Sequence, residues 1–253
     1  MVLADITGRN FDEFLLKVQM GKVPGARITW RFGQNPDIDD LDTEDIWDFG
    51  GIYTELDGPT TLYGWSTAAD TQTIQVQGLD ENYNACVETF TLTGTTPVAL
   101  PCDFITICEV KNISSTPITG TVYVSRVSGS VLQANVVATI LPTYQTSNLG
   151  RCAIPVGYTG FLFYGTASVS LSSPVNVPQA DVYFYVKKYN GVFTLVEEIT
   201  TGGNGVESPR PWLPLPEKTL MKTKAKAYDE NASVRTSFGV LLLDNDMYDL
   251  DIS

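Results

Sequence analysis

The densest group of chemically capable side chains is an acidic tract at residues 37–48. Seven of these twelve residues carry carboxylates: Asp37, Asp39, Asp40, Asp42, Glu44, Asp45 and Asp48. Carboxylate oxygens are ligands that Ca²⁺ prefers. The tract departs from an EF-hand loop, because Leu41 occupies the third ligand position and Asp42 replaces the required glycine. We therefore predict a solvated or partner-facing acidic loop, with a calcium site as the alternative.

A second segment, IPVGYTGFLFYGTASVSLS (154–172), places Gly157, Gly160 and Gly165 in a short window. A phosphate-binding loop needs such glycines followed by a helix whose N-terminal amides meet the anion. Here the segment alternates instead, and its odd-numbered residues from Phe161 to Leu171 share one face. Alternation with period two is typical of a strand. We predict a hairpin in which Gly157 and Gly160 reverse the chain before a long strand.

The four cysteines are Cys86, Cys102, Cys108 and Cys152, and the chain has no histidine. No Cys-x-x-Cys pair occurs, so a structural zinc site is not expected. We predict buried, reduced thiols made in a cytoplasm. The absence of histidine removes Ser-His-Asp and Cys-His catalysis and the usual near-neutral acid–base group. The prediction is a protein that is not an enzyme, with no catalytic, cofactor-binding or metal-binding residues assigned.

Three further charged groups have ordinary structural explanations. Adjacent strand residues face opposite ways, so Glu197 and Glu198 are not expected to form a glycosidase pair. The alternating lysines Lys222, Lys224 and Lys226 indicate a charged outer face or a protected sheet edge. The C-terminal segment, with Asp244, Asp246, Asp249 and Asp251, is predicted to be a surface tail.

The net charge of −13, from 16 basic and 29 acidic residues, disfavours binding to nucleic acid or to anionic membranes. The first ten residues, MVLADITGRN, lack the features of a secretory signal, and no apolar run approaches the length of a membrane span. We expect neither nucleic acid nor a membrane as a partner.

The elements that must position these residues are short strands. Alternating runs occur at 73–77, 86–92, 121–127, 181–187 and 234–242, and GLDENYN (78–84) has the composition of a hairpin turn. The fold class is therefore all-β: an antiparallel β-sandwich, jelly-roll-like, with an N-terminal arm. One short helix is predicted near residues 10–20, with Asn10 as its cap, Phe11, Phe14, Leu15 and Val18 on one face, and Gly21 at its end.

The predicted domain organisation is an acidic arm over residues 1–60 and a β-sandwich domain over residues 61–253. A subdivision of the sandwich near residue 150 is left open. The arm is expected to pack on this domain or on a neighbouring chain.

Several segments in order resemble a family of tailed-phage virion structural proteins. They are VPGARITWRFGQN (23–35), IWDFGGIY (46–53), VQGLDENYNACVETFTLTGTTPV (76–98), AIPVGYTGFLFY (153–164), LPEKTLMKTKAKA (215–227) and FGVLLLDND (238–246). They reach across nearly the whole chain, apart from about 99–152. The resemblance implies a β-rich component of the virion, assembled in the host cytoplasm, with no known catalytic residues to transfer.

Three functional hypotheses follow. The first is a capsid-associated decoration or cement subunit that contacts the major capsid protein or neighbouring virion proteins and forms a homo-oligomer, with a trimer as one option. The second is a tail, neck or fibre component. The third, from another class, is a carbohydrate-binding module for host attachment, suggested by Tyr183 and Tyr185 on the predicted outer face of their strand.

Overall fold

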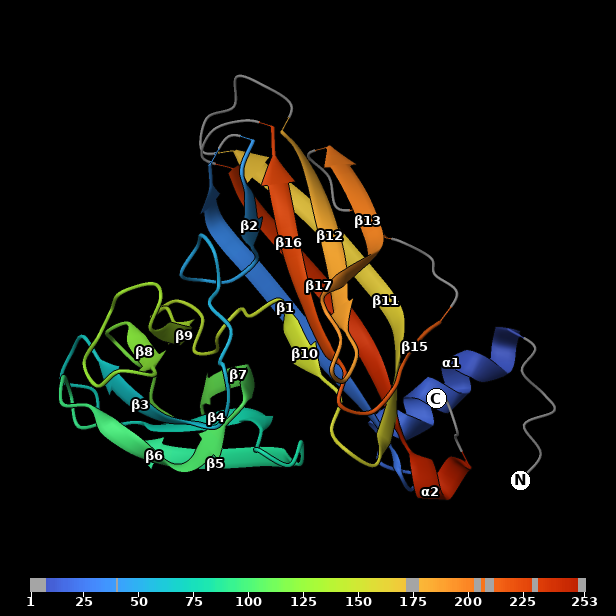
Figure 1. The fold of residues 1–253 in the computed structure, drawn as a ribbon, viewed down its shortest axis with the longest axis horizontal. Helices are drawn as coiled ribbons and strands as arrows, with labels where there is room; N and C mark the ends of the chain where they lie inside the picture. Colours follow the sequence, from blue (N-terminus) through green and yellow to red (C-terminus); the bar gives the residue numbers. More distant parts are fainter. Residues whose placement is uncertain are drawn as a thin grey trace.

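The computed structural model describes residues 8–39, 41–171, 178–202, 206–207, 212–228 and 232–249. Every strand pair in this part of the chain is antiparallel, and helices occur only near its two ends. The predicted all-β sandwich class is confirmed. Figure 1 shows two lobes, a large one with long strands and a smaller one coloured teal to green.

The large lobe is a sandwich of two sheets. The first contains, in order, β1 (Ala26–Ile38), β17 (Ala232–Asp244) and β11 (Tyr158–Leu171), with β14 (Val206–Glu207) and β15 (Leu213–Leu215) both paired to β11. The second contains β10 (Arg151–Ala153) and β2 (Thr43–Asp45), both paired to β16 (Leu220–Ala227), followed by β12 (Gln179–Lys187) and β13 (Thr194–Gly202). We call this lobe the jelly roll, because its strands pair in the nested order of that fold.

The pairing order defines the topology of the large lobe. Because β2 and β10 lie along the same side of β16, they act as two halves of one strand; β14 and β15 do the same along β11. Counted this way the lobe has eight strands, and the first pairs with the eighth, the second with the seventh, the third with the sixth and the fourth with the fifth. That nested pairing is the jelly roll.

The small lobe is a second sandwich inserted between β2 and β10. Its sheets are β6-β3-β8-β9 and β5-β4-β7. The bounds are β3 (Thr60–Ser66), β4 (Thr73–Leu79), β5 (Ala85–Thr91), β6 (Val98–Phe104), β7 (Thr106–Asn112), β8 (Val122–Ser125) and β9 (Val136–Ile140). We call this lobe the inserted sandwich. Both halves of its predicted β4–β5 hairpin are in place, and the Asp80 carboxylate accepts hydrogen bonds from the backbone N–H groups of Asn82 and Asn84 in the turn.

Each sandwich has its own hydrophobic core, built from the alternation that the sequence predicts. Ile74 and Val76 of β4 are fully buried in the inserted sandwich, and Val182 and Phe184 of β12 in the jelly roll. Burying one such side chain contributes roughly 1.5–3 kcal/mol. The cores therefore account for most of what holds each lobe together.

The strand pairing divides the chain differently from the predicted arm at 1–60 and single sandwich at 61–253. Residues 26–38 are a full strand of the jelly roll, paired with β17 along nearly their whole length. The core of the jelly roll includes Ile46, whereas the next residue, Trp47, lies in the core of the inserted sandwich. The chain returns between Leu149 and Cys152, near the boundary at residue 150 that the sequence left open. Strand β1 could not be recognised from the sequence, because it has few apolar residues and their alternation is weak.

The N-terminal helix, α1 (Gly8–Gln19), begins earlier than predicted, so Asn10 lies within the helix and is not its cap. The predicted apolar face consists of Phe11, Phe14, Leu15 and Val18. Val18 is buried and Phe14 and Leu15 are half-buried, whereas the other helical positions from Glu13 to Gln19 are exposed; the side chain of Phe11 is outside the described part. Gly21 ends the helix in the left-handed conformation, with φ of 67°. The second helix, α2 (Asn245–Tyr248), follows β17 directly.

The segment 154–172 contains the predicted long strand, β11, but no hairpin. Gly157 does turn the chain, with φ of 79°, yet the strand before it, β10, belongs to the opposite sheet. Gly160 lies within β11, where an added Cβ would meet the Ile154 side chain at 2.5 Å. The turn therefore connects the two sheets of the jelly roll.

The predicted alternation of β11 is also broken. A β-bulge shifts the register between Leu162 and Tyr164, so Leu162 faces the core before the bulge while Ala167 and Val169 face it afterwards. One extra residue reverses the inward parity of a strand. Phe161 and Phe163, which the sequence placed beside Ala167, consequently lie on the outer face.

The close approach of β1 to the returning chain gives a first prediction. A Cβ on Gly33 would lie 2.7 Å from the Gly150 Cα and 2.8 Å from its N, and backbone atoms cannot move aside as a side chain can. We expect Gly33→Ala to lower the free energy of unfolding by about 2 kcal/mol, as overpacking does. Gly58→Ala is the matched control, since nothing lies within 4 Å of its added methyl group. Equal urea midpoints for the two variants would contradict the close packing.

Candidate functional site

The two sandwiches are joined where the chain crosses between them twice. We call residues 46–50 and 147–151 the neck. The Ile46 N–H donates to the Thr223 carbonyl at 3.0 Å, the Gly150 N–H to the Ile46 carbonyl at 2.9 Å, and the Thr223 N–H to the Gly150 carbonyl at 2.8 Å. The two crossings are thus bonded to each other and to β16. Such a connection differs from a flexible linker, in which few contacts cross the boundary.

The acidic tract separates into two groups at the neck. Asp37, Asp39 and Asp42 are exposed, as expected for a solvated loop, and Asp40 is outside the described residues. Glu44, Asp45 and Asp48 are buried, so the prediction of a solvated or partner-facing loop is wrong for them. Buried carboxylates need donors or cations to offset their desolvation, and the neck supplies both.

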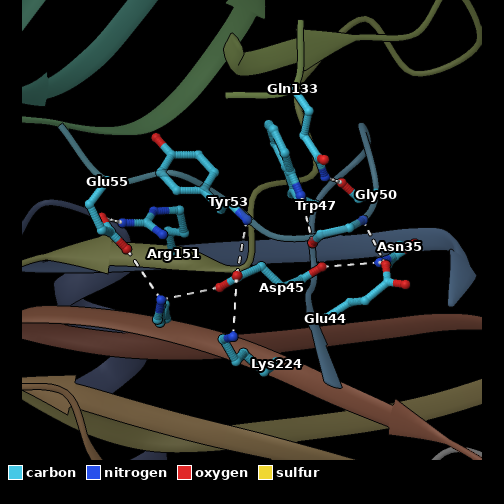
Figure 2. Close-up of polar contacts among 12 residues, drawn as sticks. Asn35, Glu44, Asp45, Trp47, Gly50, Tyr53, Glu55, Gln133, Arg151 and Lys224 are labelled. Carbon is cyan, nitrogen blue, oxygen red and sulfur yellow. Dashed lines mark hydrogen bonds and ion pairs between the residues drawn. The ribbon is translucent and has the colours of Figure 1, made fainter. Parts of the chain in front are cut away.

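Asp45 is the centre of the buried charges, as Figure 2 shows. Its carboxylate lies 3.4 Å from the Lys222 Nζ and 3.6 Å from the Lys224 Nζ, and it accepts a hydrogen bond from the Tyr53 backbone N–H at 3.0 Å. The lysines come from β16 of the jelly roll, whereas Tyr53 belongs to the core of the inserted sandwich. One carboxylate therefore contacts both lobes.

Arg151 is buried beside this carboxylate. Its Nη2 donates to the Glu55 carboxylate, and its guanidinium lies over the Tyr53 ring, 3.9 Å from the centroid. The other Glu55 oxygen accepts from Lys222 at 3.3 Å. Burial alone would raise the pKa of Glu55, but Arg151 and Lys222 together hold it below its usual value. These pairs link Arg151, through Glu55 and Lys222, to Asp45, as Figure 2 shows.

Glu44 organises the start of the inserted sandwich. Its carboxylate accepts from the Asn35 Nδ2 at 2.8 Å and from the Gly51 backbone N–H at 2.6 Å, and the Asn35 amide also donates to the Asp45 carbonyl. The Gln133 side chain, from the loop before β9 of the inserted sandwich, donates to the Gly50 carbonyl at 2.9 Å. This turn is therefore held by strand β1 on one side and by the inserted sandwich on the other.

Asp48 is bonded to the returning crossing. Its two carboxylate oxygens accept from the Asn148 backbone N–H at 2.7 Å and from the Asn148 Nδ2 at 2.9 Å. Burial nevertheless raises the pKa of Asp48 to about 6, because these two bonds only partly offset the desolvation.

Apolar contacts complete the junction. Leu79 and Cys108 of the inserted sandwich pack against Ala153 of the jelly roll in a small buried cluster. The turn of the β4–β5 hairpin provides another contact, where the Val156 N–H donates to the Tyr83 carbonyl at 2.9 Å. The relative placement of the lobes is thus fixed at several separate points.

The lysine series lies on an inner strand, so the prediction of a protected sheet edge is wrong. Strand β16 lies between β12 and the β2/β10 pair. Lys222 and Lys224 neutralise Asp45, and the Lys226 Nζ lies 5.5 Å from the Tyr228 ring centroid. These side chains belong to the outer face of the sheet, as the other interpretation stated.

Tyr183 and Tyr185, predicted to be exposed, are half-buried on this same face. Their ring centroids are 6.4 Å apart, and the Tyr183 hydroxyl is 3.4 Å from the Asp181 carboxylate. Burial and this carboxylate raise the pKa of Tyr183 to about 12. On the neighbouring strand β16, Lys224 is paired with Tyr183 and Lys222 with Tyr185. The two rings therefore lie beside charged side chains rather than on an open surface.

The remaining charged groups are structural. Glu197 and Glu198 oppose Phe184 and Tyr183 in the β12–β13 register, and successive positions face opposite sides, so the two carboxylates do not converge. The predicted surface tail is the end of β17 followed by α2, and Asp246 and Asp249 are exposed as expected. Asp244 caps the helix by accepting from the Asp246 and Met247 N–H groups. Asp251 lies outside the described residues.

The cysteines are not uniformly buried. Cys108 and Cys152 are buried as predicted, whereas Cys86 and Cys102 are partly exposed. Within the described chain, the group with metal-compatible spacing is Cys86, Glu88 and Cys102, and no such group occurs in the acidic tract. The calcium alternative therefore has no support in the described carboxylates.

The feature that sequence reasoning missed is an aromatic outer face on the β1-β17-β11 sheet. Trp30 contacts Phe163 and Tyr164 with ring centroids 5.6 and 5.5 Å apart, and Phe163 stacks on Trp212 at 5.6 Å. Phe32, on the same face of β1, is 59% exposed. We define the aromatic outer face by Trp30, Phe32, Phe161, Phe163, Tyr164 and Trp212. The alternating Trp30 and Phe32 were a usable signal, because both lie on the face of β1 opposite the buried Gly33.

A cleft continues from this face. It has a volume of about 310 Å³ and lies between the outer face of the sheet and the chain that leads back to the neck. Its lining residues are Phe32, Gly33, Gln34, Tyr144, Asn148, Thr166, Ser168, Arg235, Thr236 and Ser237. Exposed aromatic rings beside a cleft with an arginine are typical of surfaces that bind another protein.

Comparisons with known proteins leave the family open. No family model matches the chain, and no curated protein matches it. Among solved structures, a chain of the Cowpea mosaic virus top component, a naturally occurring empty particle, aligns over 74% of this chain and 82% of its own, with 7% identity and a TM-score of 0.22. A putative secreted protein from Parabacteroides distasonis aligns over 87% and 90%, with 9% identity and a TM-score of 0.22. Likeness at this level supports no inference. In the described residues, no helix has the length and apolar character to cross a membrane.

The neck network gives a second prediction. Replacing Glu55 with glutamine leaves the buried Arg151 without the carboxylate that its Nη2 contacts. The Nε and Nη1 of Arg151 have no hydrogen-bond partner among the described residues that could compensate. We expect Glu55→Gln to lower the free energy of unfolding by about 2 kcal/mol, less than for a fully buried pair because Glu55 is one-third exposed. Glu13→Gln breaks an exposed helical pair with Lys17 and should leave the urea midpoint unchanged. If Glu55→Gln changed the urea midpoint no more than Glu13→Gln does, the ion-pair network would contribute nothing to stability.

Asp48 gives a third prediction, a pH dependence. Its pKa rises from an ordinary 3.8 to about 6 on folding, so the protonated group favours the folded state. Its stabilising contribution is fully present below pH 4 and is lost as the pH rises through 6, a change of about 3 kcal/mol. Urea unfolding of the wild type and of Asp48→Asn from pH 4 to pH 7 measures it. The difference between the two proteins should fall by most of that amount over this range, and a constant difference would contradict the burial of this charge.

Proposed function

We propose that the protein is a non-enzymatic structural component of a virion, most specifically a decoration or cement subunit that bridges coat subunits on a phage capsid. The observation that carries the proposal is the aromatic outer face, which presents the exposed rings of Trp30 and Phe32, backed by four half-buried aromatic rings, on a long-stranded sheet. The resemblance of ordered segments to tailed-phage virion proteins supplies the particle context. The jelly roll by itself carries no functional conclusion, because many unrelated functions use it.

The construction of the neck supports a bridging role. A subunit that contacts two neighbours at once transmits force between them only if its two contact surfaces keep a fixed relation. Here the outer face of the jelly roll and the inserted sandwich are connected by two hydrogen-bonded crossings, by the ion pairs of Asp45 and Glu55, and by the Leu79 cluster. A flexible linker would have lost that relation.

The composition of the aromatic outer face suits a protein partner. Trp, Tyr and Phe are enriched in the cores of protein interfaces, where they contribute large contact areas at low entropic cost. The adjoining cleft offers Arg235 and the hydroxyl groups of Thr166 and Ser237 at the rim. In the proposal the partner is the major capsid protein or a neighbouring virion protein, and further copies of this chain complete the contact.

The two other hypotheses stand differently. A tail, neck or fibre component would use the same face and is separated from a decoration subunit by position and copy number. The carbohydrate-binding hypothesis has lost its motivating observation, since Tyr183 and Tyr185 are half-buried and bordered by charged groups. It is not proposed further.

The proposal gives a fourth prediction. In particles whose only source of this protein is the Phe32→Ser variant, we expect incorporation to fall about tenfold or more, as for the loss of an interface anchor. Val192→Ser removes a side chain that is 78% exposed at the β12–β13 turn, and it should be incorporated normally. Mass spectrometry of purified particles measures the incorporation, and thermal unfolding of the isolated variants checks that both remain folded.

Cryo-electron microscopy of the wild-type particle locates the chain in the same experiment. Many copies on the capsid shell would support the decoration role. A few copies at the tail of the virion, or where the tail joins the capsid, would overturn that role and support the second hypothesis. Complete absence of the chain from purified particles would overturn the virion proposal as a whole.

A further inference from the structure

Two thiols meet at the open edge of the inserted sandwich. Cys86 lies on β5 and Cys102 on β6, each at the edge of a different sheet. No backbone ladder joins these two strands, yet the Cys86 Sγ and the Cys102 Sγ are 2.7 Å apart. Both side chains are partly buried against the core of the inserted sandwich. At this position the two sheet edges meet through side chains, with two sulfur atoms in contact.

The separation of the sulfur atoms points to a covalent bond rather than to a shared metal. Thiolates that bind one tetrahedral zinc ion at about 2.3 Å lie about 3.8 Å from each other. A disulfide has an S–S length of about 2.05 Å. The observed 2.7 Å is well inside the metal-bridged distance. Glu88 has a carboxylate oxygen within 4.8 Å of both sulfurs. A metal ion bound by these three residues is therefore the alternative to a disulfide, and an experiment must distinguish the two.

We propose that Cys86 and Cys102 form a disulfide in an oxidising medium, and that this bond locks the two sheets of the inserted sandwich together. A disulfide oxidant such as oxidised glutathione completes the chemistry. One protein thiol loses its proton and attacks the glutathione disulfide, releasing one glutathione thiolate. The second protein thiol loses its proton and attacks the mixed disulfide, releasing the other. Two electrons pass from the protein to glutathione, and the two protons lost by the protein thiols end on the two glutathione thiolates.

The rate of closure should depend strongly on pH. Burial and the neighbouring Cys102 thiol raise the pKa of Cys86 to about 12, so the attacking thiolate is scarce at neutral pH. The other two cysteines serve as internal references, because Cys108 and Cys152 are buried and burial raises the pKa of both thiols. In a reducing cytoplasm the pair stays open, and release into an oxidising medium closes it.

Closure should raise the resistance of the inserted sandwich to unfolding. The two cysteines are sixteen positions apart, and a disulfide across a loop of this size restricts the unfolded chain. We expect the midpoint temperature of the oxidised protein to exceed that of the reduced protein by roughly 5–10 °C. The proposal is independent of the virion function, because it concerns the chemistry of one edge and needs no partner.

Thiol counting tests the proposal on the full-length protein. The protein is incubated with oxidised glutathione at pH 7 and pH 9, with dithiothreitol as the reduced control, then quenched in acid, unfolded and titrated. We expect the free thiols to fall from four to two, faster at pH 9, with a Cys86–Cys102 peptide in non-reducing mass spectrometry. The Cys102→Ser variant should keep its three thiols, apart from slow glutathionylation at Cys86, and should gain no thermal stability with the oxidant.

The remaining outcomes overturn the proposal. Four free thiols after prolonged oxidation would exclude the bond, and a peptide linking Cys86 to Cys108 or Cys152 would assign the chemistry elsewhere. Zinc titration of the reduced protein distinguishes a metal site from a disulfide. Stoichiometric zinc binding that is lost in both Cys102→Ser and Glu88→Gln, together with resistance of the thiols to oxidised glutathione, would make this edge a metal site.

Discussion

The structure depends on one constraint: the second strand of the jelly roll is cut in two, and both halves must remain on β16. The chain leaves after β2 and returns at β10, with an entire sandwich between them. Each half is only three residues long, which is too short to hold its place through backbone hydrogen bonds alone. The buried charges of the neck serve this purpose. Asp45 on β2 and Arg151 on β10 are bonded, through Lys222 and Glu55, to the same stretch of β16.

Buried ion pairs are an expensive way to join two lobes, because the desolvation cost rivals the attraction. Their advantage here is specificity of placement. Apolar contacts such as that of Leu79 with Ala153 tolerate sliding. A carboxylate that forms ion pairs with Lys222 and Lys224 and accepts from the Tyr53 N–H reaches all three groups in one position. The close approach of Gly33 to Gly150 adds a steric limit to the same junction. Together they make the two sandwiches a single body.

Sequence reasoning recovered what depends on local periodicity. The strands around Ile74, Val182 and Phe238 could be predicted, because one buried face repeats every second residue. It could not find the insertion, because a nested pairing is a long-range property and the crossings at Ile46 and Gly150 resemble ordinary loops. The acidic tract misled for a related reason: its carboxylates look solvated until Lys222 and Arg151, more than a hundred residues later, are placed beside them.

The bulge in β11 explains both the failed face assignment and the surface on which the proposed function rests. Without it, the parity set by Ala167 and Val169 would direct Phe161 and Phe163 into the core. The extra residue re-aims them outward, so Phe163 and Tyr164 both reach Trp30, over Gly239, where an added Cβ would meet the Phe163 and Trp30 rings at 2.7 and 2.9 Å. A bulge with a glycine beneath its rings is a defined feature rather than a packing fault. Full burial of these half-buried rings would contribute more to folding, so their outward placement is the observation on which the proposed partner surface rests.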